Sequence, residues 1–163
     1  MGETYIEQLI KQKMTTATLF KIAGLLLAEV ASIGVVVLFI PQFFILPLLV
    51  LFGVIFFIKR ISCVEFEYIY CNGEVDIDRI LGMESRKRFV SIDARKMEIL
   101  APVGASALAP YKDLKVYDCS TNTGAHAYEV VTERKGKKVR IIFEPNKEIL
   151  DGLRLYAPRK VLW

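Results

Sequence analysis

The longest apolar stretch of the sequence covers residues 22–58, far more than a helix or strand of a water-soluble domain requires. Its first part, residues 22–40, is interrupted only by Glu29 and a few small residues, and a break at Pro41 separates it from a second apolar run over residues 43–58. At about 1.5 Å per residue, the first run reaches roughly 28 Å as a helix, close to the thickness of a bilayer core. The pattern predicts two membrane-spanning helices folded back as a hairpin.

Ahead of the hairpin, residues 1–21 form a polar segment with four apolar side chains at helical spacing, Tyr5, Ile6, Leu9 and Ile10. Such spacing favours a short amphipathic helix lying along the membrane surface. An N-terminal extension of the first span fits the same residues equally well, and the sequence leaves both alternatives open.

After Arg60 the apolar residues switch to a period of two, which is typical of half-buried strands. The Asn72-Gly73 pair between two such runs predicts a hairpin turn, because both residues tolerate positive φ. Residues 101–113 are rich in Pro, Gly and Ala and are expected to form a loop. The predicted strands cover residues 64–70, 75–80, 88–92, 96–100, 114–117, 127–132 and 139–143.

A single amphipathic helix is predicted to close the chain. Asn146 is a good N-cap, and Ile149, Leu150 and Leu153 form an apolar face that Tyr156 extends. The fold class is therefore α+β: an N-terminal helical hairpin followed by a seven-stranded antiparallel sheet or barrel, capped by a C-terminal helix.

Seven antiparallel strands followed by one helix is the element order of the pleckstrin-homology (PH) superfold. The segment 68–77, Tyr-Ile-Tyr-Cys-Asn-Gly-Glu-Val-Asp-Ile, is similar to the opening hairpin of bacterial PH-like domains, and residues 145–156 are similar to their closing helix. The whole chain resembles small uncharacterised bacterial two-span membrane proteins with a C-terminal PH-like domain, here residues 61–163. The resemblance implies no catalytic motif.

Lipid-binding eukaryotic PH domains hold phosphoinositides with Lys and Arg around their first hairpin loop. The turn taken here as its counterpart, Asn72-Gly73-Glu74, is short and acidic. We therefore expect no specific phosphoinositide site at this turn.

The positive charges that flank the hairpin predict its orientation in the membrane. Lys11, Lys13 and Lys21 precede the first span, Lys59 and Arg60 follow the second, and the connecting turn carries no charge. By the positive-inside rule, both termini and the PH-like domain are expected on the cytoplasmic side of a bacterial plasma membrane. The three cysteines form no CxxC pair, which argues against a disulfide framework or a zinc site and favours a reducing compartment.

Two groups of residues are candidates for binding. Glu29 lies inside the first span, where a carboxylate costs a few kcal/mol, so it is expected to face the other span, a partner chain or a water-filled cavity. From Lys59 onward, 19 Lys and Arg stand against 15 Asp and Glu. The candidates for contact with lipid headgroups cluster near two turns: Arg86, Lys87, Arg88, Arg134, Lys135, Lys137 and Lys138. Two solvated hairpin ends are the alternative.

Catalysis and cofactor binding find little support in the sequence. Asp118, Cys119 and His126 are the only grouping with nucleophile chemistry, and they lack a family signature. The single His and the isolated glycines predict no metal site and no phosphate loop, so no cofactor is expected. The net charge of +4 is too small to indicate a nucleic-acid-binding surface.

The sequence therefore predicts a non-enzymatic adaptor or assembly protein at the bacterial inner membrane. Its expected partners are the lipid bilayer and either an unidentified protein or further copies of itself. One alternative is an accessory subunit of a transporter or channel that acts through the hairpin and Glu29. A second is a sensor of anionic lipid that acts through the basic turns.

Overall fold

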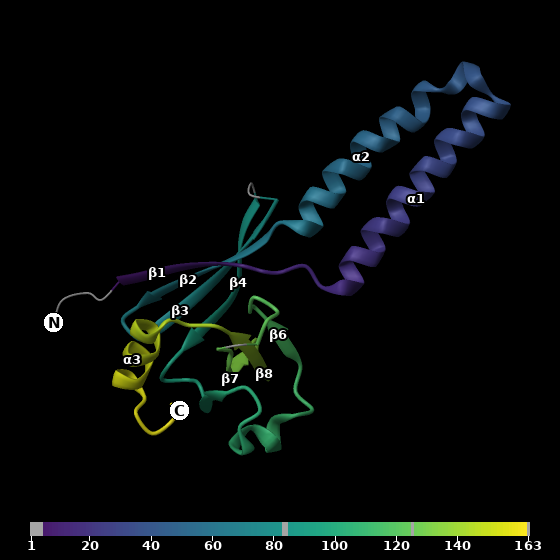
Figure 1. Ribbon diagram of the computed structural model, residues 1–163. Helices are drawn as coiled ribbons and strands as arrows, with labels where there is room; N and C mark the ends of the chain where they lie inside the picture. Colours follow the sequence, from purple (N-terminus) through teal and green to yellow (C-terminus); the bar gives the residue numbers. More distant parts are fainter. Residues whose placement is uncertain (1–4, 83–84, 125, 163) are drawn as a thin grey trace.

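The computed structural model describes residues 5–82, 85–124 and 126–162. A helical hairpin projects from a β-sandwich, and a C-terminal helix lies against the sandwich at a distance from the hairpin (Figure 1). The mixed α+β class agrees with the prediction, and so does the order of its parts, except that one strand precedes the hairpin.

The hairpin consists of α1 (Thr16–Phe39), a short 3-10 turn η1 (Pro41–Phe43) and α2 (Ile45–Ser62). Most of its side chains are exposed, including most of its large apolar ones, while Glu29 and Pro47 are buried. Both helices are long and apolar enough to span a membrane, and their exposure distinguishes them from the buried core helices of soluble proteins. The predicted helical pair is therefore present, and each helix continues past its apolar run into polar residues near the sandwich.

The first sheet has the order β1-β2-β3-β4 and is antiparallel throughout. Strand β1 precedes the hairpin, and β2 follows it. The two strands pair from Tyr5 opposite Cys71 to Lys11 opposite Glu65. The helical hairpin is thus an insertion between two neighbouring strands of one sheet. The strands are β1 (Tyr5–Lys11), β2 (Val64–Cys71), β3 (Glu74–Leu81) and β4 (Ser85–Asp93).

For Tyr5–Lys11, neither the amphipathic helix nor the extension of the first span is correct, because these residues form a strand. Residues 16–21 do belong to the first helix, and residues 1–4 lie outside the described part of the chain. Ile6 and Ile10 pack against the core, whereas Tyr5 and Leu9 are exposed. These residues repeat at a spacing of four, which fits both a helix and a strand. Pairing with β2 decides between them, and the folded unit includes β1 as well as residues 61–163.

The Asn72-Gly73 turn joins β2 to β3, with φ of 48° and 88°. It is the second connection of the first sheet, since β1 lies before it. The expectation that this turn is the counterpart of the first hairpin loop of PH domains is therefore wrong. The first connection of the sheet is the helical hairpin. The sequence concealed this because β1 is separated from β2 by the whole hairpin.

The second sheet has the order β5-β7-β8-β6, and β6 runs parallel to β8. The described residues therefore form eight strands where seven were predicted, and these strands are not all antiparallel. Residues 96–98, predicted to begin the fourth strand, form the turn before β5, and the expected loop contains the 3-10 helix η2 (Ser106–Tyr111). The strands are β5 (Ile99–Pro102), β6 (Val116–Asp118), β7 (Tyr128–Arg134) and β8 (Lys137–Phe143).

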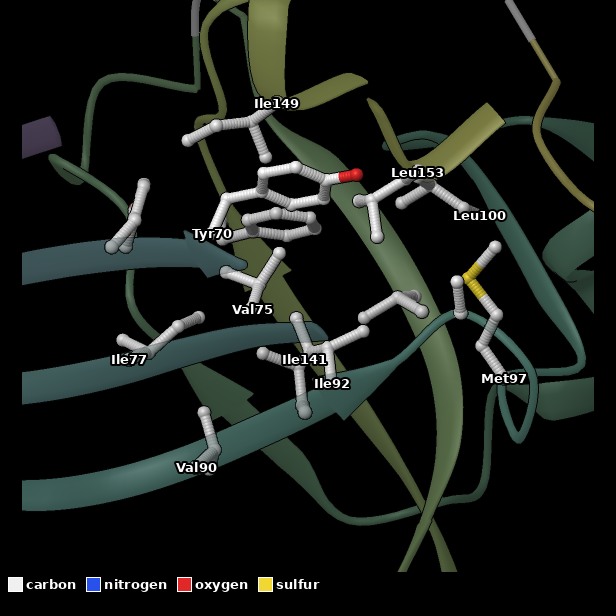
Figure 2. Packing of buried hydrophobic residues seen from close by; sticks show 14 of the residues in the cluster. Tyr70, Val75, Ile77, Val90, Ile92, Met97, Leu100, Ile141, Ile149 and Leu153 are labelled. Atoms are coloured by element: carbon white, nitrogen blue, oxygen red, sulfur yellow. The ribbon is translucent and has the colours of Figure 1, made fainter. Parts of the chain in front are cut away.

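Helix α3 (Lys147–Tyr156) covers the end of the sandwich farthest from the hairpin. Its N-cap is formed as predicted, with the Asn146 side chain accepting from the Ile149 N–H at 2.9 Å. Ile149 lies above the Tyr70 ring and Leu153 lies beside its hydroxyl end, while Val75 and Ile92 lie lower, toward the sheet (Figure 2). All of these side chains are buried in one continuous core.

Gly152→Ala should destabilise the protein by about 1–3 kcal/mol because α3 lies close to the Tyr70 ring. A Cβ atom at Gly152 would lie 2.5 Å from Cζ of Tyr70, a side chain with only 1% exposure. Thermal unfolding measures the effect, and Asp151→Ala on the exposed face of α3 is the control. Equal melting temperatures for the two variants would contradict the packing.

Candidate functional site

The two connections between the hairpin and the sandwich lie side by side. Only Cys63 separates α2 from β2. On the other connection, the Gln12 N–H donates to the Val64 carbonyl at 2.9 Å, so the β1–β2 ladder continues to the base of the helices. Both helices of the hairpin therefore leave the first sheet at the same end of two neighbouring strands, β1 and β2.

A polar loop that follows β6 holds the linker to α1. The Lys13 N–H donates to the Thr121 carbonyl at 2.9 Å, and the Asn122 side-chain amide donates to the Lys13 carbonyl at 2.8 Å. Thr121 in turn donates its hydroxyl to Glu144 at 2.8 Å. The base of the hairpin is thus bonded to both sheets, which couples any tilt of α1 to the sandwich.

The first basic group of the sequence prediction lies beside α2. The Gly82 N–H donates to the Cys63 carbonyl at 2.8 Å, and this bond brings the β3–β4 tip against the helix base. Arg86 forms ion pairs with Glu67 at 2.5 Å and Asp78 at 2.8 Å. In the same row, Arg88 pairs with Asp76 at 2.7 Å, while Lys87 is exposed. Arg86 and Arg88 therefore balance acidic residues of their own sheet.

The second basic group lies at the β7–β8 turn, beside β4. The Arg134 guanidinium donates to the Phe89 carbonyl at 2.8 Å and lies 4.5 Å from the Tyr117 ring centroid. Lys138 pairs with Glu98 at 2.5 Å, and this pairing lowers the pKa of Glu98. Lys135 and Lys137 are exposed. The second group is thus connected to β4 through the bond between Arg134 and the Phe89 carbonyl.

Glu29 is buried between the two helices, with 6% of its surface exposed. Its Oε1 atom has no hydrogen-bond partner among the described residues. Glu29 is the buried residue of α1, whereas most neighbouring side chains of this helix are exposed. An unpaired carboxyl in such a place costs free energy and is usually retained for a function.

The arrangement around Cys119 does not suit nucleophilic catalysis. Cys119 is fully buried, and burial, with a smaller contribution from Asp118, raises the pKa of its thiol to about 12. His126 is exposed at the surface. A catalytic cysteine needs the opposite shift, toward the thiolate. Among the described residues, no three His, Cys, Asp or Glu side chains come together as a metal site.

Two structural features escaped the sequence reasoning. One is β1, whose alternation of Ile6, Gln8 and Ile10 toward the core is the signal that could have revealed a strand. The other is the contact between Arg134 and Tyr117, which joins residues far apart in the chain and has no local signal.

A family model described as Bacterial PH-like domain (DUF6106) matches residues 2–163. The chain belongs to this family. The match confirms the resemblance to bacterial PH-like proteins of unknown function, and its range includes β1 and the helical hairpin as well as the sandwich. The curated proteins and the solved structures contain no significant match to the chain. A PH-like domain that carries two such helices is indicative of a membrane-associated module.

Proposed function

We propose that this PH-like protein spans the bacterial plasma membrane twice and acts as a non-enzymatic adaptor or assembly unit on the cytoplasmic face. The observation that carries the proposal is the insertion of the hairpin between the paired strands β1 and β2. Because both helices leave the sheet at the same end of β1 and β2, the sandwich is held directly at the membrane surface. The basic residues at the helix ends, Lys59 and Arg60 among them, favour the cytoplasmic side.

The adaptor role is supported by an open strand edge. On β1, the described residues form a ladder with β2 alone, which leaves seven residues of outer edge available. The other edge strands are less suited to pairing with a partner strand. Strand β4 carries the charged residues Arg86, Lys87 and Arg88, and β6 is only three residues long. Strand β5 is covered by the C-terminal segment, where the Leu162 N–H donates to the Leu100 carbonyl. We therefore propose that a partner adds a strand along β1.

The test uses backbone groups of β1. Because Gln12 donates toward β2, Ile10 and Gln8 also direct their N–H groups to β2, and Glu7 directs its N–H outward. Glu7→Pro should remove the outward donor while preserving the β1–β2 ladder. Glu7→Ala, which keeps the N–H group, is the matched control. The proteins bound to each variant are identified by crosslinking in native membranes followed by mass spectrometry. The Pro variant should lose its protein partners, and the Ala variant should keep them.

A second candidate function lies inside the bilayer, and the buried unpaired carboxyl of Glu29 favours it. In an accessory subunit of a transporter or channel, Glu29→Leu should abolish complex formation or transport and leave the sandwich folded. Glu29→Leu is tested in the same crosslinking experiment. If partners are lost in Glu29→Leu but retained in Glu7→Pro, the adaptor proposal is rejected. An unchanged pattern in Glu29→Leu would reject this candidate.

A further inference from the structure

The cations at the β7–β8 turn lie where the inner face of the second sheet extends beyond the core. Along β8, Ile141 and Val139 are buried on this face, and Lys137 is the next residue on it. Arg134 is the cross-strand partner of Lys137. The backbone N–H of Arg140 donates to the backbone carbonyl of Lys115 at 2.9 Å, which brings Lys115 alongside Val139 on the neighbouring strand. Three cations thus continue the row of buried apolar side chains.

Aromatic contacts hold two of these cations in place. Arg134 is fixed by its bond to the Phe89 carbonyl and lies 4.5 Å from the Tyr117 ring centroid and 6.0 Å from that of Phe89. The Lys115 ammonium lies 5.1 Å from the centroid of the same tyrosine. Since Tyr117 contacts both cations, their charges are held together in the absence of a ligand.

A hollow of about 450 Å³ lies among these residues, lined mainly by Lys115, Tyr117, Arg134, Lys135, Lys137 and Lys138. The carboxylates that face it are few. Glu98 pairs with Lys138, and Glu133 is the cross-strand neighbour of the same lysine. In residues 5–82, 85–124 and 126–162, no ion pair involves the other four cations. The hollow therefore carries an uncompensated positive charge.

We infer that this hollow binds a phosphate group, carried either by a soluble compound or by a lipid headgroup. A guanidinium held by its neighbours and converging ammonium groups match the oxygens of a compact oxyanion. The volume suits a compact ligand better than an extended acidic peptide. This site is independent of the adaptor proposal, because it lies on the β4 side of the sandwich and the proposed partner strand lies along β1 at the opposite edge of the first sheet.

The test is calorimetric titration of the full chain, held in phosphatidylcholine nanodiscs, with inorganic pyrophosphate at low ionic strength. The wild type should show saturable binding that weakens with added salt. Lys115→Glu/Lys137→Glu should weaken it by about tenfold or more, because two attractive charges become repulsive. Lys96→Glu/Lys147→Glu makes the same change of net charge at exposed positions outside the hollow and should bind like the wild type.

Absence of saturable binding, or equal weakening in the two double variants, would overturn the inference. The source of the phosphate is distinguished by a photo-crosslinking amino acid in place of Lys135 in phosphatidylglycerol vesicles. Lipid adducts would identify a headgroup as the natural ligand. If pyrophosphate binds and no lipid adduct forms, the ligand is a soluble phosphate compound. Crosslinking at β1 reports on the adaptor proposal separately, so either idea can fail alone.

Discussion

Replacement of residues 13–63 by the dipeptide Asn-Gly should give a water-soluble protein that keeps the β1–β2 ladder and the core of the sandwich. Gln12 and Val64 are hydrogen-bonded neighbours at the end of this ladder, at an N···O distance of 2.9 Å. A two-residue Asn-Gly loop is the preferred connection for such a pair. The far-ultraviolet circular dichroism spectrum and a cooperative urea transition would establish the fold.

The matched control is a chain that begins at Val64 and lacks β1. It should be unstable, because Ile6 and Ile10 are partly buried against the core, and full burial of such side chains, about 1.5–3 kcal/mol each, is the upper limit of what they contribute. The loss of the seven-residue ladder with β2 and of the Gln8 bonds to Glu144 and Asn146 adds to this. Together these terms approach the whole stability of a typical domain, about 5–15 kcal/mol. Equal urea midpoints for the two chains would contradict the role of β1.

Local signals explain what could be predicted from the sequence. The apolar run over 22–58 specifies the helical hairpin by its length, the Asn72-Gly73 pair specifies a turn by its tolerance of positive φ, and Asn146 specifies the start of α3 by its side-chain acceptor. In each case the residues that carry the signal are close together in the chain and need no distant partner.

Long-range contacts explain what could not be predicted. Tyr5–Lys11 has a spacing that fits a helix and a strand, and only pairing across the hairpin selects the strand. The hollow at the β7–β8 turn likewise depends on Lys115 approaching β8 through a parallel pairing of three residues. A strand was predicted at residues 114–117, but the sequence has no local signal for its partner or for the parallel direction of the pairing. The basic turn was visible, but its partners Phe89 and Tyr117 were not.

The inserted hairpin also has a mechanical consequence. A domain attached to a membrane by one flexible linker can reorient freely, whereas this sandwich is joined to the helices by two short connections that are bonded to both sheets. Partner binding at β1 and tilt of α1 should therefore influence each other, since the strand leads into the helix through a linker held by Thr121 and Asn122.

Glu129→Ala should destabilise the sandwich by about 3–5 kcal/mol, because it leaves a largely buried arginine without its carboxylate. Glu129 is 1% exposed and forms two bonds with Arg140, one of them between Oε2 and Nη2 at 2.8 Å. Arg140 also donates to the Lys112 carbonyl at 2.9 Å, so the pair fixes the segment that contains η2 over the second sheet. The melting temperature should fall by more than about 10 °C.

The comparison that isolates the charge effect uses three further variants. Lys11→Ala breaks a pair with Glu65 in which the lysine side chain is exposed, and it should change the stability by about 1 kcal/mol at most. Arg140→Met alone should also be strongly destabilising, since it leaves the Glu129 carboxylate buried and unpaired. Glu129→Leu/Arg140→Met removes both charges and should recover most of the loss, because a buried ion pair is expensive to break but not to replace by apolar side chains. If the double variant were as unstable as Glu129→Ala, the loss in Glu129→Ala would come from the missing contacts of the side chain and not from the unpaired charge of Arg140.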